Sequence, residues 1–83
     1  MEVLVGRITH FYKKIGVAAV EVKESLTVGD TIHIKGHTTD LEQKIESIEL
    51  EHQKIPKADM GQVVGVKVKD HVRENDLVYR IEP

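Results

Sequence analysis

Apolar and polar residues alternate along several short stretches of the chain. The clearest alternation runs from Thr31 to Lys35, where Ile32 and Ile34 share one side and His33 faces the other. A period of two is typical of a β-strand with one buried face. No run of eleven or more residues places its apolar positions at helical spacing, so the pattern predicts an all-β protein.

The same pattern predicts six strands. In the first strand the apolar phase changes after Gly6, and in the fourth it changes near Glu46 and Ser47, which indicates a β-bulge in each. Short strands separated by turn signals favour a small closed antiparallel barrel, an architecture without open edges. The predicted strands are Val3–Tyr12, Val17–Val22, Thr31–Lys35, Gln43–His52, Gln62–Lys69 and Leu77–Ile81.

Glycine and polar residues mark the connections between these strands. Lys13 to Gly16 is predicted to form a hairpin turn. The polar segment from Gly36 to Glu42 is predicted to be an exposed functional loop, and Asp70 to Asp76 a charged loop. Ile55 to Gly61 is predicted to form a short helical turn, with proline at its first position.

Length and composition indicate one small domain over residues 1–83. The chain has no cysteine, which excludes a disulfide and thiolate chemistry and favours a reducing cytoplasm. The N-terminal residues lack the basic-then-apolar order of a signal peptide. The longest uncharged stretch, Ile15 to Val20, is too short to span a bilayer, and we expect no membrane contact.

The charge is nearly balanced, with 12 Lys and Arg against 14 Asp and Glu and a formal net charge of −2. A domain that binds a phosphate backbone unaided is usually basic, so strong autonomous nucleic-acid binding is disfavoured. Strands distant in sequence could still assemble a basic face. Phe11 and Tyr12 are candidates for base stacking, although alternation sends one of them inward. The candidate phosphate contacts are Lys13, Lys14, Lys35, Lys67, Lys69, Arg73 and Arg80.

No constellation typical of catalysis is present. His33 and His37 lie four apart, but across a strand end and a glycine loop, and no cysteine accompanies them, so we expect surface histidines and no metal site. Ser25 and Ser47 lack the local signature of a nucleophile. The acidic residues from Asp40 to Glu51 form either a docking or cation-binding face or, as the simpler interpretation, a solvated strand face. We therefore expect no catalytic residue, no metal and no cofactor.

Short motifs follow one another along the chain in a fixed order: Gly6-Arg7, Gly16-Val-Ala-Ala-Val20, Val28-Gly29-Asp30-x-Ile32, Gly36, Ser47-Ile48, Ala58-x-x-Gly61-x-x-Val64-Gly65 and Val72-Arg73-x-x-Asp76. This ordered set resembles the second, β-barrel domain of translational GTPases such as elongation factor Tu, also found as a free-standing elongation-factor-like protein. A similar barrel is appended to some collagenase-like peptidases.

The resemblance implies a non-catalytic, translation-related module that contacts ribosomal or transfer RNA, or a ribosome-associated protein. It places Glu49 and His52 near the pocket that supports the aminoacyl end of transfer RNA. The Gly-rich phosphate loop of a GTPase is absent, so no GTP binding is expected. The alternative is an accessory barrel that docks to an enzyme, as in the peptidases; a monomer is favoured in both cases. The candidate binding residues are Lys35, Gly36, His37, Glu49, His52, Lys67, Lys69 and Arg73.

Overall fold

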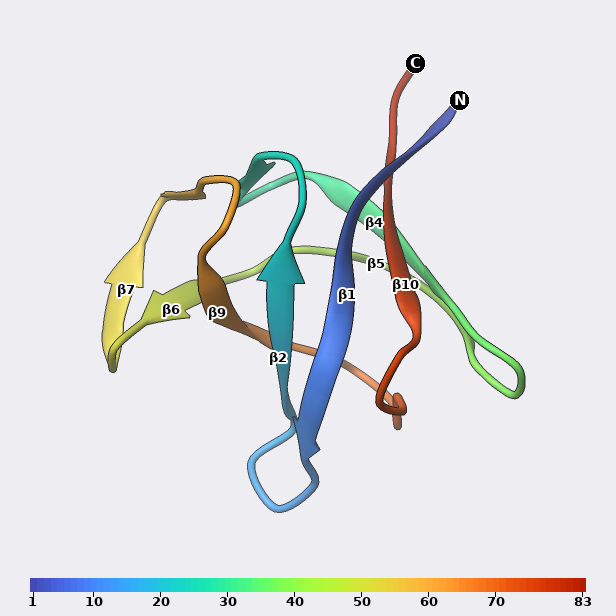
Figure 1. The fold of residues 1–83 in the computed structure, drawn as a ribbon, viewed down its shortest axis with the longest axis horizontal. Coiled ribbons are helices and arrows are strands. Elements are labelled where there is room, and N and C mark those ends of the chain that lie inside the picture. Colours follow the sequence, from blue (N-terminus) through green and yellow to red (C-terminus); the bar gives the residue numbers. More distant parts are fainter.

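The computed structural model describes residues 1–83 and contains strands but no helix, which confirms the all-β prediction. Figure 1 shows these strands wrapped around one interior. They are β1 (Glu2–Tyr12), β2 (Val17–Val22), β3 (Leu26–Thr27), β4 (Thr31–Lys35), β5 (Asp40–Lys44), β6 (Ile48–Leu50), β7 (Gln53–Ile55), β8 (Lys57–Ala58), β9 (Val63–Lys67) and β10 (Leu77–Ile81).

Eight of the strands form one antiparallel sheet in the order β5-β4-β10-β1-β2-β9-β6-β7, and β3 pairs with β8 separately. The ladder ends at β5 and β7, so the strands form no closed barrel, and the prediction of a six-stranded closed barrel is wrong in both respects. Where the chain leaves β5 at Ile45, its backbone continues the pairing with the segment that precedes β4. There the Ile45 N–H donates to Asp30 O, and the Gly29 N–H donates to Ile45 O, each at 2.9 Å.

A side chain joins β5 to the far part of the sheet. Gln43 is only 5% exposed. Its Nε2 donates to the carbonyl oxygen of Lys67 at 2.9 Å, and its Oε1 accepts from the N–H of Lys69 at 2.8 Å. The amide thus makes the two hydrogen bonds that a neighbouring strand would otherwise make to the end of β9. The gap in the ladder is bridged by one glutamine.

Branched aliphatic side chains fill the interior, because alternation directs one row of each strand inward. The predicted inward residues of β2, β4 and β9 are all buried: Ala18, Val20, Val22, Ile32, Ile34, Val64 and Val66, together with Val68 just beyond β9. The register shift between Leu4 and Gly6 confirms the bulge at Gly6. A Cβ at Gly6 would lie 2.7 Å from Val20 Cγ1, so a side chain there would collide with the core.

Residues 36–61 differ most from the prediction. Strand β5 begins at Asp40, inside the predicted loop, and the predicted strand Gln43–His52 is interrupted at residues 45–47. The predicted helical turn at Ile55 to Gly61 is wrong: the end of β7 and all of β8 occupy that segment. Ala58 pairs with Leu26, and both are fully buried. Strand pairing is favoured over a helical turn in this segment because it places Ala58 in the core.

The chain termini and three of the connections between strands lie at opposite ends of the molecule. Figure 1 shows both chain termini at one end, here called the proximal end, together with the segments that follow β2 and precede β9. The Met1 ammonium donates to Glu82 O at 2.8 Å, which fixes the termini side by side. At the opposite, distal end lie the β1–β2 turn at 13–16, the β4–β5 tip at 36–39 and the loop at 68–76.

Candidate functional site

Four shallow surface hollows all lie at the distal end. Two of them, of about 260 and 390 Å³, share Phe11, Lys13 and His71. A third, of about 320 Å³, lies between residues 38–41 and Asp70, His71 and Arg73. His71 therefore lines three adjoining hollows. We call the part of this end formed by Phe11, Lys13, Lys69, His71 and Arg73 the distal surface.

An aromatic contact forms the centre of the distal surface. The ring of His71 meets the ring of Phe11 edge-on, with centroids 4.9 Å apart and an interplanar angle of 72°. Phe11 is partly buried against the core, because alternation at the end of β1 turns it inward while Tyr12 stays exposed. The prediction that one of these two aromatic residues faces the core is confirmed.

Hydrogen bonds at both ends hold the loop that carries His71. The Val68 N–H donates to Gly16 O at 2.9 Å, which extends the pairing of β9 with β2 beyond the strand. At the other end, the Arg73 N–H donates to Asp76 Oδ2 at 2.8 Å. Within the loop, Asp70 Oδ1 accepts from the His71 N–H at 2.7 Å. These bonds fix the backbone, so the charged side chains project from a defined frame.

The distal surface carries three cations without an ion-pair partner, although Asp70 and Glu74 line the same hollows. Lys13, Lys69 and Arg73 are exposed, and none of them takes part in an ion pair, since the chain's ion pairs involve other residues. The neighbouring Glu74 lies 3.4 Å from His10 Nδ1. The cations are therefore free to meet an anionic group from outside the chain.

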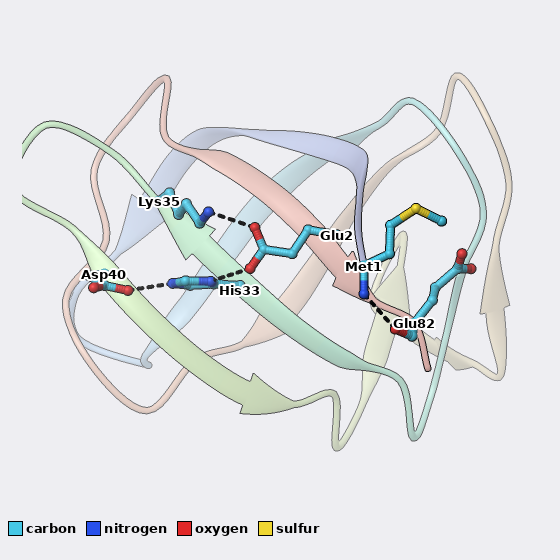
Figure 2. Close-up of polar contacts among 6 residues, drawn as sticks. All are labelled: Met1, Glu2, His33, Lys35, Asp40 and Glu82. Carbon is cyan, nitrogen blue, oxygen red and sulfur yellow. Dashed lines mark hydrogen bonds and ion pairs between the residues drawn. The ribbon is translucent and has the colours of Figure 1, made fainter.

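A separate charged cluster joins β1, β4 and β5, as Figure 2 shows. His33 Nδ1 lies 2.6 Å from Glu2 Oε2, and its Nε2 contacts Asp40 Oδ1. The second oxygen of Glu2 lies 2.6 Å from Lys35 Nζ. The Lys35 ammonium also stands 5.1 Å from the centre of the Tyr79 ring. Only 18% of the His33 side chain is exposed, so this cluster is a partly buried link between three strands.

The carboxylates set the protonation of this cluster. Hydrogen bonds to Asp40 and then to Glu2 raise the pKa of His33 above its ordinary value. The bonds from Lys35 and His33 lower the pKa of Glu2, and Glu2 in turn raises the pKa of Lys35. Both ring nitrogens of His33 face carboxylates, so the imidazolium form is favoured and no lone pair is free to act as a base. The cluster is suited to holding strands together.

The structure places the predicted binding residues in three groups. Lys35, Gly36 and His37 border a hollow of about 550 Å³ at the β4–β5 tip. Lys69 and Arg73 lie on either side of His71 on the distal surface. Lys67 is exposed at the end of β9, paired with Val17.

Glu49 and His52 are not part of these groups. Glu49 lies opposite Gly65 on β6, and His52 is in the β6–β7 turn with a φ of 67°. Tyr79 of β10, in contrast, lies beside Lys35 in the cluster around His33. Glu49 and His52 are therefore separated from the hollows of the distal end.

Sequence reasoning missed two features of the site. It treated His71 as a residue of a charged loop, although Phe11, its partner, was singled out. It also missed the Glu2–His33–Asp40 contacts, because Asp40 was assigned to a loop and not to the strand paired with β4. The alternation of His33 with Ile32 and Ile34 was the available signal that His33 faces outward. No group of three or more His, Cys, Asp or Glu side chains is arranged to hold a metal ion.

Comparison with known proteins identifies relatives among peptidases. The chain is 42% identical over 79 residues to an uncharacterized protease from Methanocaldococcus jannaschii, covering 94% of this chain and 19% of that protein. It is 37% identical over 83 residues to a collagenase from Porphyromonas gingivalis, covering 98% and 20%. The chain therefore spans about a fifth of the length of the curated relatives it matches. No family model matches the sequence.

Solved structures show the fold. The crystal structure of the C-terminal domain of a U32 peptidase from Geobacillus thermoleovorans matches with a TM-score of 0.90 at 22% identity, covering 95% of this chain and 92% of that one. Its selenomethionine variant matches with a TM-score of 0.87 at 23% identity, covering 92% and 96%. This chain thus has the fold of a U32 peptidase C-terminal domain.

These findings correct the resemblance to the second domain of translational GTPases. The sequence relatives are named as proteases and collagenases, and the matching structures are of a peptidase domain. The translation-related role implied by the resemblance is wrong. The motifs misled because glycines and Val-Gly-Asp turns mark β-bulges and strand starts in many small β-folds. The structure contains no helix of the length and hydrophobicity that a membrane span requires.

Proposed function

We propose that this chain is a non-catalytic accessory domain that acts beside a peptidase and contacts it through protein–protein surfaces. The observation that carries this proposal is the extent of the sequence match. Nearly the whole chain aligns with about a fifth of relatives named as a protease and a collagenase. Four fifths of each relative lie outside the match, which is ample length for a separate catalytic region.

The chemistry of the site supports a non-catalytic role. The most buried histidine, His33, has both ring nitrogens occupied by carboxylates. The distal surface offers cations and an aromatic pair but no side-chain nucleophile next to a base, which hydrolysis by a protein nucleophile requires. The absence of cysteine from so small a domain also supports a cytoplasmic location.

The proximal end is the part that we propose to contact the peptidase. In a relative of greater length, the remaining residues join the matching segment at its termini, which lie together at this end. Large apolar side chains are exposed nearby: Met60 is 71% exposed in the turn before β9, and Val63 is 52% exposed at its start. Exposed apolar side chains of this size contribute to interfaces when a partner covers them.

Affinity purification of this chain from its native cells, after nuclease treatment, tests the proposal. We expect a peptidase to be recovered, and titration calorimetry with that purified peptidase to give saturable binding. Met60→Asp with Val63→Asp should weaken binding at least about tenfold, because charges enter an apolar contact. The exposed lysines Lys54 and Lys57, changed to Gln, provide the matched control and should leave affinity unchanged.

The outcomes separate the accessory role from its alternatives. Recovery of ribosomal components that disappear with nuclease, and no peptidase, would contradict the proposal. Peptide-bond hydrolysis by the purified chain alone would contradict the non-catalytic part. Equal loss of binding in the lysine control would show that the loss does not come from the apolar contact of Met60 and Val63.

A further inference from the structure

We propose that the distal surface binds an acidic segment of a polypeptide. In this complex, carboxylates of the segment contact Lys13, Lys69 and Arg73, and an apolar side chain between them lies on the Phe11–His71 pair. The inference deepens the proposed accessory role by assigning it a recognition task, and it rests on that role only for its biological setting.

The cations without ion-pair partners favour an anionic ligand. The whole chain is slightly negative, with a formal net charge of −2, yet three cations without ion-pair partners surround one aromatic pair at the distal end. Arg73 offers a planar guanidinium that can bind a carboxylate with two hydrogen bonds. Lys13 and Lys69 border the same hollow next to His71. Carboxylates a few residues apart would meet these cations at separate points.

The Phe11–His71 pair accounts for an apolar residue in the segment. Phe11 packs against the core from its inner side, so its ring is held in place while it lines two of the hollows. An apolar or aromatic side chain placed there gains contact area without reordering the site. The hollows are open and of about 260 and 390 Å³, which suits side chains of an extended peptide better than an enclosed small molecule.

The surroundings favour a short acidic peptide over a nucleic acid. A polyphosphate carries its charges continuously and would extend past the three cations. It would also meet the carboxylates between them: Asp70 lines the same hollow as Lys13 and Lys69, and Glu74 lines the same hollow as Lys13 and Arg73. Asp40 lines the adjoining hollow with Arg73. A peptide can place neutral residues at these positions. The acidic neighbours therefore select for separated carboxylates.

The position of the surface agrees with this task. Figure 1 places the β1–β2 turn and the loop before β10 at the end opposite the two termini. A domain joined or docked at its proximal end leaves the distal surface open to solvent. An acidic segment could then be bound there while the accessory contact persists.

Fluorescence anisotropy with a labelled Glu-Glu-Phe-Glu-Glu peptide tests the inference on this chain. We expect saturable binding that weakens with added salt, and at least about tenfold weaker binding for the Gln-Gln-Phe-Gln-Gln peptide and for the Glu-Glu-Ala-Glu-Glu peptide. Arg73→Gln, and Lys13→Gln with Lys69→Gln, should each reduce affinity by a similar factor. Lys54→Gln with Lys57→Gln should not.

Amide chemical shifts provide a second measurement, because a variant that failed to fold would lose its dispersed spectrum. The acidic peptide should shift the signals of His71 and Phe11 and leave the β6–β7 turn unchanged. Failure to bind at millimolar peptide, equal binding of the neutral peptide, or tighter binding of a single-stranded RNA oligonucleotide would overturn the inference. None of these results depends on whether a peptidase contacts the proximal end, so the two proposals fail independently.

Discussion

The carboxylate of Asp76 occupies the space that a side chain on Gly36 would need. A Cβ built at Gly36 would overlap Oδ1 of Asp76, and Asp76 is only 4% exposed. Its other oxygen accepts from the Arg73 N–H. Glycine at the end of β4 therefore serves close packing against the loop before β10. The sequence interpretation of Gly36 as part of an exposed functional loop did not include this contact.

Gly36→Ala should destabilise the fold by about 1–3 kcal/mol, because either the β4–β5 tip or the Asp76 loop must move. Urea unfolding measures the change. In an Asp76→Ala background the same substitution should lose most of its effect, since the carboxylate that it strikes is gone. Equal effects in the two backgrounds would show that the two residues are not coupled.

The free energy of unfolding should fall as the pH rises above about 6.5. The pKa of His33 is raised from its ordinary value of 6.5 by Asp40 and Glu2, so the stabilisation is complete below the unfolded-state pKa and is lost as the pH rises through the folded-state pKa. The charged and titratable neighbours are Glu2 on β1, Lys35 on β4, Asp40 and Glu42 on β5 and Tyr79 on β10.

Urea unfolding of the wild type and of His33→Gln across this pH range measures the effect. The variant should lack the part of the pH dependence of the unfolding free energy that His33 contributes. His37→Gln removes an exposed histidine at the β4–β5 tip and should keep the wild-type slope. If His33→Gln and the wild type showed the same pH dependence, the contacts with Glu2 and Asp40 would not control its protonation.

Below this range the pKa of Glu2, lowered by Lys35 and His33, gives the opposite dependence. Its stabilisation is present above the unfolded-state pKa near 4.5 and is lost as the pH falls through the lower folded-state value. Glu2→Gln should flatten the acid side of the stability curve. It should also reduce the upward shift of the His33 pKa, which an NMR titration of the ring protons would detect.

Gln43→Leu should cost about 1–3 kcal/mol, because the Lys67 carbonyl and the Lys69 N–H lose their partner in a partly buried setting. Hydrogen exchange of the Lys69 amide should accelerate in this variant. Gln53→Leu, an exposed change on the edge strand β7, should alter stability by less than about 0.5 kcal/mol. Retention of the slow Lys69 exchange in Gln43→Leu would mean that this side chain does not bridge the ladder.

Replacing both residues of the β6–β7 turn with residues that adopt positive φ values readily should stabilise the protein. Glu51 and His52 have φ values of 51° and 67°, the left-handed pair of a type I′ turn, which asparagine and glycine adopt more readily. Glu51→Asn with His52→Gly should stabilise the protein by about 0.5–1 kcal/mol. Binding of the acidic peptide should not change. A loss of binding would show that Glu51 or His52 belongs to the binding site, as the sequence predicted for His52.

The alternation of side chains predicted the strands whose pattern is uninterrupted. β2, β4 and β10 have the predicted bounds, because each buries one face against the same core and period-two patterning is local. The region from Gly36 to Gly61 was less predictable. Strands β6, β7 and β8 are two to three residues long, too short for a period to be distinguished from a loop. Strand β5 has five residues, but its buried position is the polar Gln43, so it shows no apolar alternation.

By itself the sequence determined the all-β class, the inward rows of Val and Ile and the bulge at Gly6, since each follows from neighbours along the chain. Only the tertiary structure decided that Gln43 completes an open sheet, that Asp40 faces His33, and that His71 lies against Phe11 among unpaired cations. Those contacts join residues far apart in sequence or on strands whose pairing was unknown. They depend on strand order and register, which a local pattern of apolar residues does not specify.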